Sequence, residues 1–362
     1  MKDLDHETAS FRYRESLYGS AIWRLLARSG DWDRWDNIVV DNATQDLRLR
    51  WKVESTSGVV ESGWRRVRAA RLRIRYHPVG VEVLVHGTCA GSILGERCHT
   101  NAFVNKTVAE MVQTIADQNE MPARIRGTSG KRTDFQGSMP DGQFIRQKLL
   151  PMAIDKGGIS GYYFWIENGE RLVFEPIQSA GANSIGTFTL QAPTDEIGAR
   201  AIQQLDVRFD RLGDPYRGCG VMDAWGFDVL NKQSARWRAD DGSVPYLKMA
   251  PAVPKPAKVP SLVEPMAFPE IGENVPGSLK EHAMGHWSVG AQNLFRTDLR
   301  IPVNPKAKPG QFVNLIVQNP KGEKHFSSGT WLGYAVELNA AQTPEGRAAE
   351  TRLYLERRNW YA

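Results

Sequence analysis

The stretch FVNKTVAEMVQTIADQNEM, residues 103–121, opens the part of the chain with the clearest local signals. Its apolar residues repeat at i, i+3, i+4 and i+7, the spacing of one helix face: Val108, Met111, Val112 and Ile115. Thr107 and Glu110 form the Thr-x-x-Glu capping box that starts such a helix. The sequence therefore predicts an amphipathic helix that begins near Val108.

A second helix is predicted further along the chain. Residues at helical spacing follow one another here: Phe144, Ile145, Lys148, Leu149 and Met152. Asp141 is the expected N-cap. Pro151 must end or kink this helix, because proline lacks an amide hydrogen and its ring clashes with the preceding turn.

A β-hairpin is predicted after this helix. Two strand-like runs, 162–166 and 171–174, flank the residues Glu-Asn-Gly-Glu. An Asn-Gly pair readily takes the positive φ angles of a tight hairpin turn. We therefore expect Asn168 and Gly169 to form a turn that defines the fold locally.

The order and spacing of these motifs resemble the baseplate hub proteins of phage tails and the related hub portion of type VI secretion spikes. The resemblance rests on residues 103–121 and on the segments DGQFIRQKLLPMA (141–153) and GYYFWIENGERLVFEP (161–176). It extends to LRIPVNPKAKPGQFVNLIV (299–317), where Pro309 and Gly310 are expected to turn the chain between two strands. Over the first hundred residues the resemblance is much weaker.

The expected fold class is α+β, mainly β. The resemblance implies two tail-tube-like antiparallel β-barrel domains, at residues 1–101 and 179–362, with a small α/β domain inserted at 102–178. Short strands separated by turn signals also favour a barrel over the first hundred residues. The last domain would include an extended, proline-rich strap at 251–277, which holds seven of the twenty prolines, and a helix at 279–295.

Alternating apolar residues predict the individual strands. Residues 46–53 are expected to form one strand with Trp51 on its apolar face, and Arg71–Tyr76 and Val81–Val85 are expected to flank a turn. Further strands are predicted at 187–191, 205–209, 299–303, 312–317, 331–338 and 351–355. The region 213–226 is predicted to be a loop.

The composition sets limits on function. The 362 residues carry 46 basic and 41 acidic side chains, a net charge of +5, which is a milder excess than a general polyanion binder shows. The N-terminal residues are too charged for a signal peptide, and no apolar run is long enough to span a bilayer. Three cysteines make no disulfide framework. We therefore expect a reduced protein that is made and assembled in the cytoplasm.

The residue types that bind zinc cluster once, as His-x2-Cys followed by Cys-His: His86, Cys89, Cys98 and His99. However, Cys98 and His99 are adjacent, so a strand would point them to opposite sides. We therefore expect no metal site, and we interpret the cysteines as small buried side chains.

Three carboxylates and two tryptophans stand together in Asp31-Trp32-Asp33-Arg34-Trp35-Asp36. Sugar-cleaving sites use this combination for acid, base and stacking. The alternative, which we favour, is a turn before an apolar strand, since residues this close in sequence need partners from elsewhere to flank a scissile bond.

The strongest charge feature is a run of arginines: Arg65, Arg66, Arg68, Arg71, Arg73 and Arg75. Because side chains alternate along a strand, Arg71, Arg73 and Arg75 share one face and form a row about 13 Å long. This row is a candidate channel wall or subunit interface. It equally fits a solvated edge strand whose charges prevent unwanted pairing. No aromatic residues interleave the arginines, as a base-stacking site would require.

The resemblance implies a structural role without enzymatic activity. It implies a homotrimeric baseplate hub in a virion tail, in which two barrels per subunit let three copies match a sixfold tail tube to a threefold central spike. Its partners would be other copies of itself, the tail tube protein and the central spike protein, with the tape measure and baseplate wedge proteins as further candidates. No cofactor, specific nucleic-acid recognition or membrane partner is expected.

Two other functions stay open. A tail-associated enzyme that degrades cell-wall polymer would need a carboxylate pair, such as Asp31 or Asp33 with a distant glutamate. A hub component of a type VI-like secretion spike would share the hub fold. Such spikes usually carry a long C-terminal β-helix, so a separate spike protein would then be expected.

Overall fold

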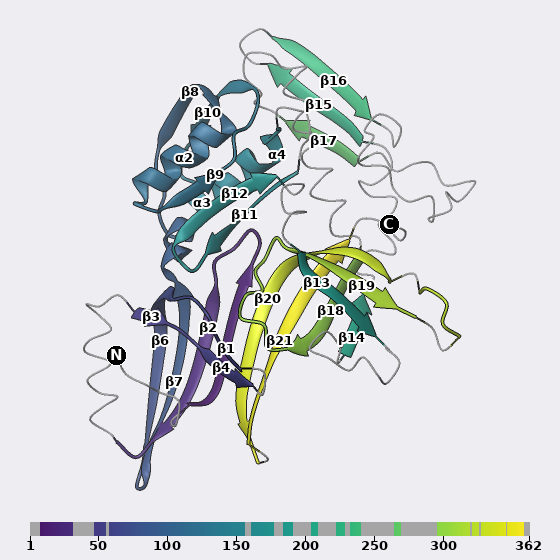
Figure 1. Ribbon diagram of the computed structural model, residues 1–362. Coiled ribbons are helices and arrows are strands. Elements are labelled where there is room, and N and C mark those ends of the chain that lie inside the picture. Colours follow the sequence, from purple (N-terminus) through teal and green to yellow (C-terminus); the bar gives the residue numbers. More distant parts are fainter. Residues whose placement is uncertain are drawn as a thin grey trace.

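The computed structural model describes residues 8–31, 47–55, 58–155, 161–176, 184–190, 204–208, 222–228, 232–239, 264–268, 295–318, 321–325, 327–344 and 346–357. Strands dominate these residues and helices are short (Figure 1). The chain is therefore α+β and mainly β, as predicted. No helix in the described part is both long and apolar enough to cross a membrane.

One eleven-stranded sheet runs through both halves of the chain (Figure 1). Its strands follow the order β14 (Gln204–Arg208), β18 (Phe295–Pro302), β21 (Gly346–Arg357), β20 (Gly329–Thr343), β1 (Thr8–Ser16), β2 (Ile22–Ser29), β7 (Gly80–Cys89), β6 (Arg65–His77) and β3 (Leu47–Leu49). Two further strands, β19 (Phe312–Val317) and β13 (Ser184–Leu190), branch from β20. The strands predicted in the last third are all present, and most are longer than predicted.

Strand β20 joins the two halves of this sheet. Its first residues pair with β19, and residues 335–341 pair antiparallel with β1, while β21 lies along its other edge. A register shift between Gly333 and Ala335 marks the point where the partner changes. No sheet closes on itself within the described residues, so the two closed barrels stay a prediction. We call β1, β2, β7, β6 and β3 the N-terminal strand set, and β13, β19, β20, β21, β18 and β14 the C-terminal strand set.

The segment between the two sets contains both helices and strands, and we call it the α/β unit. Its elements are β8 (Asn101–Thr107), α2 (Val108–Gln118), β9 (Ala123–Ile125), β10 (Lys131–Gln136), α3 (Asp141–Phe144), a π-helical turn (Ile145–Leu149), α4 (Leu150–Met152), β11 (Tyr162–Glu167) and β12 (Arg171–Pro176). A short 3-10 helix, Ala90–Gly95, leads into it. Three strand pairs of the fold are parallel, namely β12 with β9, β13 with β19 and β15 (Met222–Asp228) with β17 (Glu264–Phe268), which the antiparallel prediction did not include.

Helix α2 begins as its capping box predicts. The Thr107 hydroxyl accepts a hydrogen bond from the amide of Glu110 (3.2 Å), and the Glu110 carboxylate accepts one from the amide of Thr107 (2.7 Å). The hydrogen bonds that the Glu110 carboxylate accepts from the Thr107 amide and from the Thr107 hydroxyl (3.0 Å) lower the pKa of this carboxyl. The predicted apolar face is buried: Val108, Met111, Val112 and Ile115.

The second helix departs from the prediction at its start. Pro140 is its N-cap, and Asp141 is its first residue, with its carboxylate buried rather than capping the backbone. Only one helical residue follows Pro151, in agreement with the predicted effect of this proline. A wider π-helical turn precedes it, in which the amide of Leu150 donates to the carbonyl of Ile145. The helix ends at Met152, where the backbone becomes extended at Ala153.

Two regions were predicted incorrectly. Residues 46–53 form two strands, β3 and β4 (Lys52–Ser55), and Trp51 lies between them. Its carbonyl accepts a hydrogen bond from the amide of Ser62 (2.9 Å), its amide donates to the Ser62 hydroxyl (3.0 Å), and its ring packs 4.8 Å from that of Tyr13. The predicted loop 213–226 contains the start of β15, which pairs with β16 (Gln233–Ala239) and β17 in a separate three-stranded sheet.

The proline-rich segment 251–277 is described only at β17, where the chain is extended and paired. The predicted helix 279–295 lies outside the described residues apart from Phe295, which begins β18. Strand β4 pairs with β5 (Gly58–Glu61), and both precede the arginine-rich strand β6.

The apolar core crosses from the N-terminal strand set into the α/β unit. One buried cluster contains Val83 and Val85 of β7 together with Met111 of α2 and Phe174 of β12. A second cluster lies within the C-terminal strand set and includes Leu299, Trp331 and Leu353. The domain boundaries 1–101, 102–178 and 179–362 stay a prediction, but the first two of these segments share one core.

Candidate assembly surface

Eight arginines lie on one face of the N-terminal strand set. Cross-strand partners point to the same side of a sheet, and so do residues two apart in a strand. The register places Arg12 opposite Arg24, Arg24 opposite His86, and His86 opposite Arg71. We call the whole group the arginine face: Arg12, Arg14, Arg24, Arg28, Arg68, Arg71, Arg73 and Arg75.

The register of the neighbouring rows agrees with this assignment. Arg14 lies opposite Ile22, which lies opposite Thr88, which lies opposite Arg68. Arg28 and Arg75 both lie opposite Glu82. The other side of the same strands carries the buried core residues Tyr13, Trp23, Leu25, Val83 and Val85. The arginine face is therefore the outer face of the sheet.

Half of the arginine face has a partner. Arg28 and Arg75 lie 3.3 and 3.5 Å from the carboxylate of Glu82. Arg12 bonds Glu337 of β20 at 2.5 Å, and Arg14 lies over the ring of Tyr354 at 4.5 Å. In the part of the chain that the structure describes, no ion pair or hydrogen bond is found for the other four side chains: Arg24, Arg68, Arg71 and Arg73.

The predicted row Arg71, Arg73 and Arg75 is therefore one edge of a wider basic surface. All three side chains are exposed, and β6 is an edge strand from Arg68 onward within the described residues, since β3 pairs only with residues 65–67. The contributions of β1 and β2 to this surface were not predicted from the sequence. The alternation in Arg12-Tyr13-Arg14 was available as a signal, but which strands lie next to β6 is set by the fold.

Both predicted turns lie where the α/β unit meets a strand set. At the tip of the β11–β12 hairpin, Asn168 and Gly169 have φ angles of 55° and 77°. Their carbonyls accept hydrogen bonds from the amides of Arg66 (3.1 Å) and Gly91 (2.9 Å). The hairpin tip is therefore fastened to the N-terminal strand set.

The second turn, Pro309-Gly310, precedes β19 and connects the C-terminal strand set to the α/β unit. Gly310 has φ 83° and its amide donates to the carbonyl of Gly333 in β20 (2.8 Å). A Cβ at this position would lie 3.0 Å from the ring of Tyr163 in β11. The turn thus packs closely against the α/β unit.

An ion cluster next to this turn joins the same two parts. The buried carboxylate of Glu167 in β11 accepts a hydrogen bond from Lys308 (3.0 Å), and Arg124 and Arg171 lie 3.6 Å away. Burial alone would raise the pKa of Glu167, but the hydrogen bond and charge of Lys308, with the charges of the two arginines, outweigh it and lower that pKa. The cluster therefore stabilises the ionised form of Glu167.

Replacing Lys308 with methionine should lower the free energy of unfolding near pH 7 by about 1 kcal/mol, a value reduced for the partial exposure of Lys308. A carboxyl with a lowered folded-state pKa contributes stability above its unfolded pKa and loses it as pH falls through the folded pKa. The difference between wild type and K308M should therefore shrink below about pH 4. Urea denaturation at a series of pH values measures this. The exposed neighbour K306M is the control, and a difference that stays constant with pH would contradict the assignment.

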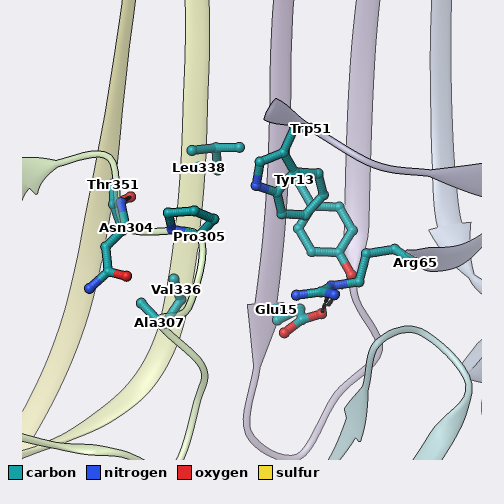
Figure 2. A pocket seen from close by; sticks show the side chains of 10 residues that line it. All are labelled: Tyr13, Glu15, Trp51, Arg65, Asn304, Pro305, Ala307, Val336, Leu338 and Thr351. Carbon is teal, nitrogen blue, oxygen red and sulfur yellow. Dashed lines mark hydrogen bonds and ion pairs between the residues drawn. The ribbon is translucent and has the colours of Figure 1, made fainter. Parts of the chain in front are cut away.

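A second buried cluster lies between the two strand sets, around a small cavity (Figure 2). The Tyr13 hydroxyl donates to Glu15 (2.7 Å), and Arg65 Nε lies 3.2 Å from the same carboxylate. Burial raises the pKa of Glu15, and the charge of Arg65 and the Tyr13 hydrogen bond oppose this. The facing wall comes from the C-terminal strand set and the loop after β18: Asn304, Pro305, Ala307, Val336, Leu338 and Thr351.

This cavity is a packing feature rather than a substrate site. Its volume of about 20 Å³ holds one water molecule. A carboxyl and a tyrosine in so small a space cannot meet a cell-wall polymer. Figure 2 shows both side chains turned toward Arg65 within the wall of the cavity.

The remaining candidate residues do not converge. Cys89 is buried and Cys98 is exposed, while His99 bonds the carboxylate of Asp141 (2.7 Å) and His86 lies on the arginine face. Across the described ranges, no group of three or more His, Cys, Asp or Glu side chains is placed to hold a metal ion. Of the acidic segment 31–36, only Asp31 is described.

Comparison with known proteins shows the fold. No protein family description and no curated protein matches the sequence. Solved structures do match along nearly the whole chain. A tail protein from Neisseria meningitidis has a TM-score of 0.59 at 12% identity, covering 97% of this chain and 92% of that one. A 43 kDa tail protein of prophage MuSo2 from Shewanella oneidensis has a TM-score of 0.57 at 10% identity, covering 97% and 94%.

A third similar structure comes from a secretion system. It is an Escherichia coli protein described as a component of the type VI secretion system with structural similarity to the bacteriophage T4 tail proteins gp27 and gp5. Its TM-score is 0.53 at 12% identity, covering 98% of this chain and 75% of that one. At these identities the similarity establishes the fold alone. The chain therefore shares the fold of these phage tail proteins and of this type VI secretion system component.

Proposed function

We propose, from a fold that this chain shares with phage tail and type VI spike proteins, that it is the baseplate hub of a phage tail: a homotrimer that joins a sixfold tail tube to a threefold central spike. The observation that carries the proposal is the sharing of β20 by the two strand sets. Each chain thereby holds two strand sets edge to edge, and we assign them to the proposed domains 1–101 and 179–362. Three chains in a ring would present six such sets.

The contacts of the Asn168-Gly169 and Pro309-Gly310 turns support an adaptor of fixed geometry. A ring of quasi-equivalent surfaces needs a constant angle between the two sets of each subunit. The α/β unit at 102–178 contacts the N-terminal set through Gly169 and the C-terminal set through Gly310 and Lys308. These contacts hold the α/β unit as a brace between the sets.

The proposed partners follow from this role. They are two further copies of the chain, the tail tube protein and the central spike protein, with the tape measure and baseplate wedge proteins as neighbours in the virion. Assembly would take place in the host cytoplasm. The row Arg71, Arg73 and Arg75 would lie on the channel wall or on a subunit interface, because its side chains are exposed on the outer face of the sheet.

A second candidate is the hub component of a type VI-like secretion spike. The similarity to the Escherichia coli secretion component favours it. Neighbouring genes distinguish the two roles, since tail genes or secretion genes would surround the coding sequence. The small cavity beside Glu15 gives no comparable support to a cell-wall-degrading enzyme.

Mass measurement under native conditions tests the hub proposal. The expected result is a species of three times the 40.5 kDa chain mass, for the protein alone or mixed with its tail tube and spike proteins. A monomer both for the protein alone and for the protein mixed with the tail tube and spike proteins would reject the proposal. A dimer or hexamer would also reject it, because neither matches threefold to sixfold symmetry.

A further inference from the structure

The arginine face has an unusual charge balance for the outer face of a sheet. Eight arginines and His86 share it with one carboxylate of the N-terminal strand set, Glu82, while Glu337 approaches from β20. Like charges opposite each other destabilise a sheet, and Arg12 lies directly opposite Arg24. The surface therefore carries positive charge that the described part of the chain does not neutralise.

Three arginines of this surface form an evenly spaced row. Arg71, Arg73 and Arg75 repeat every two residues along β6, about 6.6 Å apart, and neighbouring strands are about 4.8 Å apart. Two phosphate steps along one strand of B-DNA advance about 6.8 Å. Arginine is also the side chain best suited to bind phosphate oxygens in pairs. An extended polyanion with evenly spaced charges matches such a row.

The apolar content of the face argues against a protein partner. Protein interfaces have a core of desolvated apolar and aromatic side chains. Here Ile22 is half-exposed, while Leu26 and Leu84 are only partly exposed between the arginines. No aromatic side chain stands between the arginines of β6 as a platform for unstacked bases. This favours contact with the backbone of a duplex over contact with single strands.

We infer that the arginine face binds the phosphate backbone of double-stranded DNA without sequence preference. The four arginines without a partner in the described residues, Arg24, Arg68, Arg71 and Arg73, make the contacts. The inference goes beyond the proposed function, because binding by the isolated chain does not require a trimer or a tail.

The test is fluorescence anisotropy of labelled DNA duplexes of two unrelated sequences with the full chain, over a range of salt concentrations. Four phosphate contacts predict a slope of log K against log salt of about −3.6, which is roughly a 100-fold loss of affinity between about 50 and 200 mM salt. The two sequences should bind equally. No binding at the lowest salt, or a marked preference for one sequence, would overturn the inference.

A matched pair of variants separates this face from the overall charge. The double variant R71Q/R73Q should reduce the slope by about 1.8 and weaken binding at low salt, since two contacts are lost. The control R97Q/R146Q removes two exposed arginines elsewhere, and both variants lower the net charge of +5 by the same two units. Equal losses in the two variants would show diffuse attraction and reject the site. Displacement of the duplex by polyglutamate at equal charge concentration would instead assign the face to an acidic protein.

Failure of this test leaves the proposed function untouched. Native mass measurement reads the number of subunits and does not depend on DNA. Conversely, a monomer that binds DNA with the expected slope would reject the hub proposal and support DNA binding by the arginine face.

Discussion

Replacing Asp141 with alanine should lower the free energy of unfolding by about 3 kcal/mol, one of the two largest effects that we expect from a single substitution. Asp141 is fully buried, and its carboxylate accepts hydrogen bonds from the side chains of Asn119 (2.6 Å) and Gln136 (2.7 Å). It also accepts from the amide of His99 (3.2 Å) and contacts the His99 ring.

The size of the effect follows from what the substitution leaves behind. Gln136 is fully buried and Asn119 nearly so, so neither amide gains a water when the carboxylate is removed. Each buried donor left without an acceptor costs about 1–3 kcal/mol. The lost bonds also release Asn119, the C-cap of α2, from the start of α3.

Urea denaturation measures the effect of D141A. Asp141→Asn keeps one acceptor oxygen and should lie between wild type and D141A. The control is D117A on the exposed face of α2, where we expect a change within about 0.5 kcal/mol. A D141A midpoint equal to that of D117A would show that the buried cluster does not hold the two helices together.

The second large effect is expected at the hairpin tip. Gly169→Ala should lower the free energy of unfolding by about 3 kcal/mol. Gly169 has φ 77°, where an L residue is strained, and an added Cβ would lie 2.3 Å from the carbonyl oxygen of Arg66. The hairpin would have to move away from β6 and would lose its two backbone hydrogen bonds to Arg66 and Gly91.

A second glycine with a positive φ serves as a control that separates backbone strain from the steric clash with Arg66. Gly322 has φ 81°, and an added Cβ there meets nothing within 4 Å, so G322A should cost about 1 kcal/mol for the backbone alone. Amide hydrogen exchange should also speed up at Arg66 and Gly91 in G169A and not in G322A. Equal destabilisation of both variants would mean that the hairpin tip is not a fastening point.

Local sequence signals predicted the parts whose partners are close in the chain. The capping box of α2 joins residues three apart, and the Asn-Gly turn joins neighbouring strands. The β6–β7 hairpin is local in the same sense. In each case the residues that determine the backbone conformation lie within one turn or one hairpin. A short stretch of sequence is therefore enough to predict the structure.

The missed features depend on partners that are far away. Asp141 fits the local rule for an N-cap, and only the fold brings Asn119 and Gln136 to its carboxylate. The basic surface could be predicted only with the register of four strands. Arg24 and Arg71 lie on the two strands that flank β7, and both are opposite His86. The segment Met222–Asp228 reads as a loop because of its glycine and aspartates, and its strand partners include a proline-containing segment 42 residues further along the chain.

The pairing of β1 with β20 means that β1 is synthesised long before its partner strand. Arg12 and Glu337 are 325 residues apart, so at 5–20 residues per second the ribosome needs roughly 20–60 s to deliver the partner of the first strand. Throughout that interval the emerging chain exposes an open backbone edge on β1. We expect nascent chains to recruit a chaperone during this period, and chains stalled before residue 329 to aggregate.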